Sequence, residues 1–83
     1  MTKQLNGQGE IAIMRMIFTT ALCCHISRNP LDFPYKYRYC YENHADCLRD
    51  FNEWDGKGHP KGNWIKRKGH QGDLVNENYT KTE

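Results

Sequence analysis

The sequence has few apolar residues and lacks a long apolar run. Of the 83 residues only 37% are hydrophobic, while 27% are charged. The longest apolar stretch, residues 11–26, is interrupted by Arg15 and falls short of the ~20 residues that a membrane-spanning helix requires. Residues 1–10 are polar and contain glycine, unlike the positive and then apolar start of a secretory signal. These absences predict a soluble protein of the host-cell cytoplasm that has no membrane partner.

Sequence signatures of enzymes are also missing. Gly56, Gly58 and Gly62 do not form a phosphate-binding loop, because the Lys-Ser/Thr ending of that motif is absent. No internal repeat or low-complexity tract is present, and no small-molecule substrate is evident. We therefore predict a binding protein and not an enzyme.

A chain of this length holds one domain with a small core. At 83 residues it buries only ~60% or slightly more of the surface that its unfolded state exposes. Domains with such thin cores usually gain stability from a metal ion, disulfides or a partner chain. We expect a flexible leader at residues 1–9, a single domain at residues 10–79 and a frayed tail at residues 80–83.

The apolar spacing in the first half of the chain predicts a helix and then a strand. Residues 11–25 carry apolar side chains three and four positions apart, which favours a mostly buried helix. Their β-branched content leaves a strand as the alternative, since period alone does not assign short apolar runs. In residues 35–41, tyrosines alternate with basic residues and a cysteine, which is typical of a strand. The alternative here begins the next helix early, near Tyr39.

The second half of the chain predicts another helix and a hairpin. Residues 42–54 return to helical spacing, with their acidic side chains turned outward. Residues 63–67 and 73–79 flank a glycine-containing turn, which indicates a β-hairpin. The predicted fold is a small α+β domain. Two helices pack on a short antiparallel sheet that includes the C-terminal hairpin, with zinc as a candidate staple.

Cysteine and histidine residues form the strongest candidate site in the sequence. On a helix, Cys40, His44 and Cys47 fall on one face, because residues three, four and seven apart lie above one another. Structural zinc takes four thiolate or imidazole ligands, and Cys24 or alternatively Cys23, at the end of the first predicted helix, would supply the fourth. The spacing matches neither a zinc knuckle nor a zinc finger. Two alternatives stay open: buried free thiols, and disulfides from Cys23 or Cys24 to Cys40 or Cys47.

Acidic and basic residues are segregated along the chain. Residues 31–55 hold six acids and three bases, whereas residues 56–70 hold five bases and no acid. This suggests two faces with different roles, although a basic hairpin packed beside an acidic helix of the same chain is the alternative. The candidate partner-binding residues are the acidic side chains of the second helix and the basic hairpin with its tryptophan: Glu42, Asp46, Asp50, Glu53, Lys61, Trp64, Lys66, Arg67 and Lys68.

The first functional hypothesis is a regulator or inhibitor that binds a larger protein partner. Trp64 beside Arg67 would be a suitable hot spot, since aromatic and arginine side chains dominate such interfaces. In size, and in lacking an enzyme signature, the chain is similar in kind to small proteins of phages and mobile elements. No motif carries that likeness.

Two further hypotheses rest on the basic residues. Tyrosines and a tryptophan among lysines and arginines suit RNA or single-stranded DNA, because aromatic rings stack on unpaired bases while cations neutralise phosphates. The alternative is that the tyrosines cover a helix as core. A small nuclease-like toxin is the remaining possibility, with His59 and His70 as acid and base.

Overall fold

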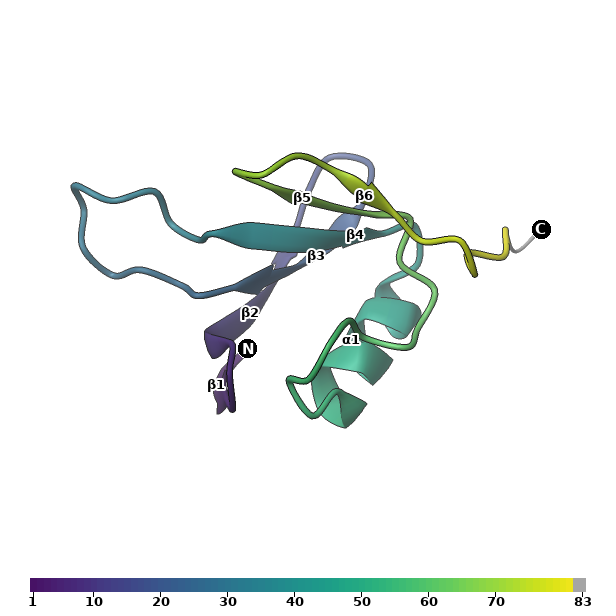
Figure 1. Ribbon diagram of the computed structural model, residues 1–83, viewed down its shortest axis with the longest axis horizontal. Coiled ribbons are helices and arrows are strands. Elements are labelled where there is room, and N and C mark those ends of the chain that lie inside the picture. Colours follow the sequence, from purple (N-terminus) through teal and green to yellow (C-terminus); the bar gives the residue numbers. More distant parts are fainter. Residues whose placement is uncertain (82–83) are drawn as a thin grey trace.

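A computed structural model describes residues 1–81 of the chain. It consists of a six-stranded antiparallel sheet and one helix, so the fold is mostly β (Figure 1). The strands lie in the sheet in the order in which they occur in the chain, and the helix follows the fourth of them. The elements are β1 (Thr2–Leu5), β2 (Gly9–Arg15), β3 (Thr20–Cys24), β4 (Tyr37–Tyr41), α1 (His44–Glu53), β5 (Lys66–Gly69) and β6 (Leu74–Val75).

The prediction of two helices on a short sheet is wrong, because residues 11–25 do not form a helix. They lie in β2 and β3, which pair antiparallel about a tight turn. The N–H of Met16 donates to the carbonyl of Thr19 at 2.8 Å and closes that turn. Ile17 and Phe18 occupy its tip, although turns usually contain glycine, proline, asparagine or aspartate. Without turn residues to divide it, the apolar run resembled one continuous helix.

Residues 1–9, predicted as a flexible leader, contain the first strand of the sheet. β1 pairs antiparallel with β2, so that Thr2 lies opposite Ala12. The connecting turn places Gly7 at a φ of 82°, a conformation that glycine adopts without steric strain. At the other end, the N–H of Thr80 donates to the Asn63 side chain at 2.7 Å. The remainder of the predicted frayed tail, residues 82–83, lies outside the described residues.

The predicted second helix, strand and hairpin are present. α1 begins after Asn43, whose side chain accepts a hydrogen bond from the N–H of Ala45 at 2.8 Å and so caps the helix. β4 lies within the predicted tyrosine strand, and β5 and β6 pair as a hairpin. No helix in the described part of the chain is long and apolar enough to cross a membrane.

The core lies between the sheet and α1, which contacts β2, β3 and β4. We call this side of the sheet the helix face. Its buried residues come from the strands, from α1 and from the segment after it, and they are Ile11, Leu22, Cys24, Tyr39, Tyr41, Cys47, Phe51, Trp54 and Trp64. The tyrosines of β4 therefore belong mainly to the core.

The opposite side of the sheet, which we call the open face, has no described helix packed on it. Strand alternation and register place on it Ala12, Ala21, Cys23, Arg38, Cys40, Lys66 and Lys68. The alanines and cysteines of this set are nearly inaccessible. Longer neighbours extend over them: Nη1 of Arg38, for example, lies 3.9 Å from Sδ of Met16. The open face therefore consists of small, buried residues that are covered by long side chains, some of them basic.

Candidate functional site

The residues predicted to bind zinc do not converge. Cys24 and Cys47 are buried in the core, Cys40 lies on the open face, and His44 is the first residue of α1. All four cysteines are free, and no three His, Cys, Asp or Glu side chains among residues 1–81 are grouped as metal ligands. Burial raises the pKa of Cys24 and of Cys47 to about 12, so both are protonated thiols at neutral pH. Among residues 1–81, the four predicted ligands are therefore not grouped as a metal site.

The acidic residues of the second predicted helix differ in their surroundings. Asp50 is only 4% exposed and accepts hydrogen bonds at one carboxylate oxygen from the Tyr41 hydroxyl at 2.5 Å and the Gly62 N–H at 3.1 Å. Asp50 thereby joins α1 to β4 and to the segment before β5. Glu42, which precedes the helix, is exposed and accepts from the Tyr79 hydroxyl. Asp46 is half-buried and Glu53 is exposed, so these two remain available at the surface.

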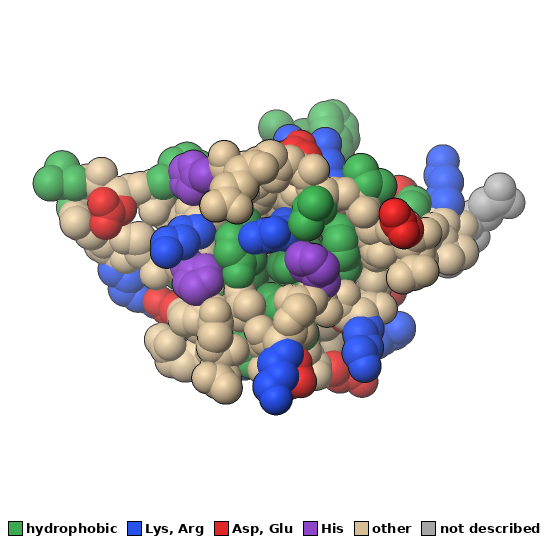
Figure 2. Space-filling view, viewed as in Figure 1, with side chains coloured by type: hydrophobic (Ala, Val, Ile, Leu, Met, Phe, Trp, Pro, Cys, Tyr) green, Lys and Arg blue, Asp and Glu red, His purple; other side chains and the backbone are tan. Residues whose placement is uncertain are grey.

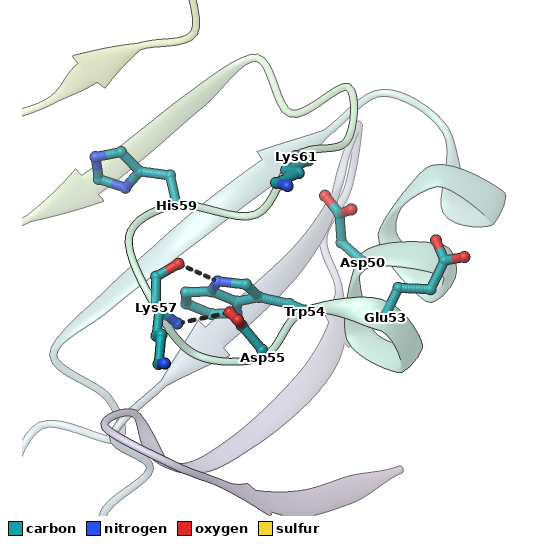
Figure 3. A pocket seen from close by; sticks show the side chains of 7 residues that line it. All are labelled: Asp50, Glu53, Trp54, Asp55, Lys57, His59 and Lys61. Atoms are coloured by element: carbon teal, nitrogen blue, oxygen red, sulfur yellow. Dashed lines mark hydrogen bonds between the residues drawn. The ribbon is translucent and has the colours of Figure 1, made fainter.

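A small hollow of about 230 Å³ lies between α1 and the segment that follows it (Figure 3). Its polar groups are largely paired within the chain: Trp54 Nε1 donates to the Lys57 carbonyl at 3.1 Å, and the Lys57 N–H donates to Asp55 at 2.9 Å. Lys61, predicted as part of the basic surface, lines this hollow beside Asp50. The mixture of acids and bases indicates a structural junction with little preference for one sign of charge.

Trp64 is not an exposed hot spot, as the sequence had suggested. Its side chain is 4% exposed, and its Nε1 donates to the Pro60 carbonyl at 2.8 Å. The indole ring packs against Tyr39 with ring centroids 5.0 Å apart. Trp64 therefore belongs to the core, and its indole N–H donates to a backbone carbonyl there.

His59 and His70 lie over different hollows. Nδ1 of His59 is 2.8 Å from the Tyr39 hydroxyl, and its ring packs beside Trp64. His70 lies in the β5–β6 connection, with its ring centroid 6.3 Å from that of Phe33. The structure does not assemble them as an acid–base pair around one cavity.

The basic residues gather where β4 pairs with β5. The register places Arg38 directly opposite Lys68, and Lys66 opposite Cys40. Across residues 1–81 the single ion pair joins Arg28 to Glu10, so no carboxylate lies within ion-pair distance of these cations. Like charges directly opposite each other on paired strands destabilise a sheet. We call the following set the basic ribbon: Lys36, Arg38, Lys66, Arg67 and Lys68.

On the helix face, the basic ribbon borders a hollow of about 360 Å³ that α1 leaves uncovered. The guanidinium carbon of Arg67 lies 3.9 Å from the ring centroid of Tyr37, and its Nε is buried without a hydrogen-bond partner. Lys36 and His70 line the same hollow. Figure 2 shows basic and histidine side chains around a hollow with hydrophobic side chains at its base. This half of the helix face therefore has the composition of an anion-binding surface.

On the open face, the basic ribbon borders a second hollow, of about 320 Å³. Nη1 of Arg38 donates to the Tyr35 hydroxyl at 2.8 Å. Phe33 packs edge-on against Tyr35 with ring centroids 5.0 Å apart, and the Phe33 side chain is still 61% exposed. Lys68 and His70 complete the rim. We call this hollow the aromatic slot.

Comparison of the chain with protein-family models, curated proteins and solved structures finds no match in any of the three. Of the basic residues selected from sequence, Lys66, Arg67 and Lys68 belong to the basic ribbon, while Lys61 lies apart from it. Sequence reasoning missed Phe33, whose place beside Tyr35 and His70 depends on how the long β3–β4 connection folds.

Buried Asp50 makes stability depend on pH. Burial raises the pKa of this carboxyl above its usual value of 3.8, despite the hydrogen bonds from Tyr41 and Gly62 that oppose the shift. The folded state therefore favours the protonated form of Asp50. This stabilises the fold fully at pH values below the pKa of Asp50 in the unfolded chain, and the stabilisation is lost as the pH rises through its pKa in the folded state. Relative to an Asp50→Asn variant, which keeps an acceptor oxygen, the parent should lose free energy of unfolding from about pH 4 upward.

Urea denaturation of the parent and of the Asp50→Asn variant between about pH 3 and pH 7 measures this difference. The difference should level off once Asp50 is fully ionised in the folded state. A difference that stays constant over the whole range would show that Asp50 titrates alike in the folded and unfolded chain.

Proposed function

We propose that the protein binds nucleic acid through the basic ribbon. The observation that carries the proposal is the direct cross-strand pairing of Arg38 with Lys68, with no carboxylate within ion-pair distance of either among residues 1–81. Such an arrangement lowers the stability of the free protein and is relieved when an anion binds. A chain of phosphates supplies several negative charges at regular spacing, which suits cations on neighbouring strands.

The distribution of acidic residues also favours binding of nucleic acid at the basic ribbon. Glu42, Asp46 and Glu53 lie on or beside α1. The basic ribbon instead lies on β4 and β5, with Lys36 immediately before β4. The molecule is therefore polarised although its formal net charge is only +2. A polyanion is attracted to the ribbon more than to α1, beside which bases and acids are mixed, and this favours docking on the ribbon.

The binding affinity for single-stranded nucleic acid should fall steeply with salt. Neutralising three or four phosphates gives a slope of about −2 to −3 for log affinity against log salt on a single strand. Fluorescence anisotropy with labelled oligouridine and oligothymidine of about 20 nucleotides measures that slope from about 50 to 200 mM salt. Polyglutamate of matched length is the competitor that tests for general attraction to anions.

Displacement by the oligonucleotide but not by equal charge of polyglutamate would support the proposal. No retention of either oligonucleotide at low salt would refute it. An affinity that does not change with salt would refute it as well, because it excludes phosphate contacts as the source of binding.

The second candidate is binding to a larger protein partner, as a regulator or inhibitor. It is favoured by Ile17 and Phe18, each 90% exposed at the β2–β3 turn, since exposed apolar groups often mark protein contacts. Leu31 is 92% exposed but lies in the connection at the opposite end of β3, so these side chains do not form one patch. With Trp64 buried, the β2–β3 turn is the better anchor for this function.

A further inference from the structure

We propose that the aromatic slot accepts an unstacked base, which makes single-stranded nucleic acid, and not duplex, the ligand of the protein. This inference rests on the proposed function, since it assigns a role to one part of the same surface. The slot lies on the open face beside the basic ribbon and is lined by Phe33, Tyr35, Arg38, Lys68 and His70, among others.

The walls of the slot are suited to a flat ring. Phe33 meets Tyr35 edge-on at an interplanar angle of 67° and His70 edge-on at 73°, so its own ring face is not stacked on either neighbour. The Phe33 side chain is 61% exposed, so much of its ring is open to solvent. A base that stacks on this ring would cover apolar surface that the protein leaves in water.

The charges around the slot fit the backbone that carries such a base. Arg38 is held by the Tyr35 hydroxyl, and Lys68 lies opposite Arg38 on β5. The volume of the slot, about 320 Å³, is at the lower end of the range for small-ligand pockets, ~300–1,000 Å³. It is therefore large enough for one heterocycle.

The slot also shares lining residues with the hollow on the helix face. Lys36, Gly69 and His70 line both cavities, so the two lie at the same end of the β4–β5 pair. A single strand that passes around this end can place a base on Phe33 while a neighbouring phosphate reaches Arg67. A rigid duplex cannot follow that path.

The test combines a protein variant with a ligand that lacks bases. Fluorescence anisotropy is measured for the parent and for Phe33→Ala with oligothymidine, with an oligomer of the same length carrying abasic sites, and with duplex DNA. Phe18→Ala is the matched control, because Phe18 is also exposed but lies at the opposite end of β3. Circular dichroism establishes that each variant is folded.

For the parent we expect about tenfold weaker binding of the abasic oligomer and of the duplex than of oligothymidine. The affinity of Phe33→Ala for oligothymidine should be about tenfold lower than that of the parent, and its affinity for the abasic oligomer should equal that of the parent. Phe18→Ala should bind all three ligands like the parent. In a Phe33→Trp variant, oligothymidine should quench the tryptophan fluorescence.

Equal binding of oligothymidine by Phe33→Ala and by the parent would overturn the assignment of the slot. Equal or tighter binding of duplex by the parent would do so too. In either case a salt-dependent affinity for nucleic acid would leave the basic ribbon in place. Absence of all nucleic-acid binding would instead remove the proposed function together with this inference.

Discussion

A Lys66→Glu, Lys68→Glu variant should bind oligothymidine about 100-fold more weakly than the parent at about 50 mM salt. Each substitution removes a cation that faces the phosphates and adds a repulsive charge, and hydrogen bonds to charged groups contribute about 1.5–3 kcal/mol each. The slope of log affinity against log salt should become shallower by about 0.7 for each lost phosphate contact on a single strand.

The same variant should be slightly more stable than the parent. The carboxylate introduced at position 68 would stand directly opposite Arg38, and the one at position 66 would lie diagonally from it, so a like-charge pair is replaced by opposite charges. Cross-strand pairs of opposite charge contribute roughly 0.2–1 kcal/mol. Weaker binding together with a higher midpoint of urea denaturation would indicate that the basic ribbon is kept for a ligand and at the expense of stability.

Lys57→Glu, Lys61→Glu is the matched control, because it changes the net charge equally. Both lysines line the hollow beside α1, where acidic side chains already surround them. This control should reduce the affinity much less than the ribbon variant does. Equal loss of affinity in the two variants would mean that net charge, and not the paired strands, governs binding.

Trp64→Ala should lower the free energy of unfolding by about 3–5 kcal/mol, which is typical for removing a large aromatic side chain from a core. Trp64 packs between Tyr39 and His59, and its loss would leave a cavity and an unpaired Pro60 carbonyl. In a domain of this size such a loss approaches the whole stability, so unfolding is measured in urea at low temperature.

Trp64→Phe is the informative comparison. It keeps an aromatic ring beside Tyr39 but cannot donate to Pro60, and it should be clearly more stable than the alanine variant. Its affinity for oligothymidine, corrected for the folded fraction, should equal that of the parent. A change in free energy of unfolding below about 1 kcal/mol for Trp64→Ala would contradict the buried position of this side chain.

The sequence predicted elements well where local chemistry marked their limits. The helical spacing of residues 42–54, the alternating tyrosines of β4 and the glycines of the β5–β6 turn are direct signals. The first half of the chain carried no such mark. Ile17 and Phe18 form a turn without any preferred turn residue, so two strands were taken for one helix.

The candidate site was predictable in composition but not in arrangement. The basic hairpin that carries Trp64 pointed to Lys66, Arg67 and Lys68, because cations beside aromatic residues are informative without coordinates. The pairing of Arg38 with Lys68 depends on the register of β4 and β5, which no local pattern specifies. The burial of Trp64 could not be predicted from the sequence either, since a tryptophan near an arginine is as typical of an interface as of a core.

The sequence by itself determined a small domain with segregated charge, an acidic helix and an aromatic, basic strand followed by a hairpin. Composition and short-range spacing carry that information. Only the tertiary structure decided that β1, β2 and β3 complete one sheet, that the cysteines are separate buried thiols, and that Phe33 borders the basic ribbon. These features depend on contacts between residues far apart in the chain, which are selected by the packing of the whole sheet and not by local preference.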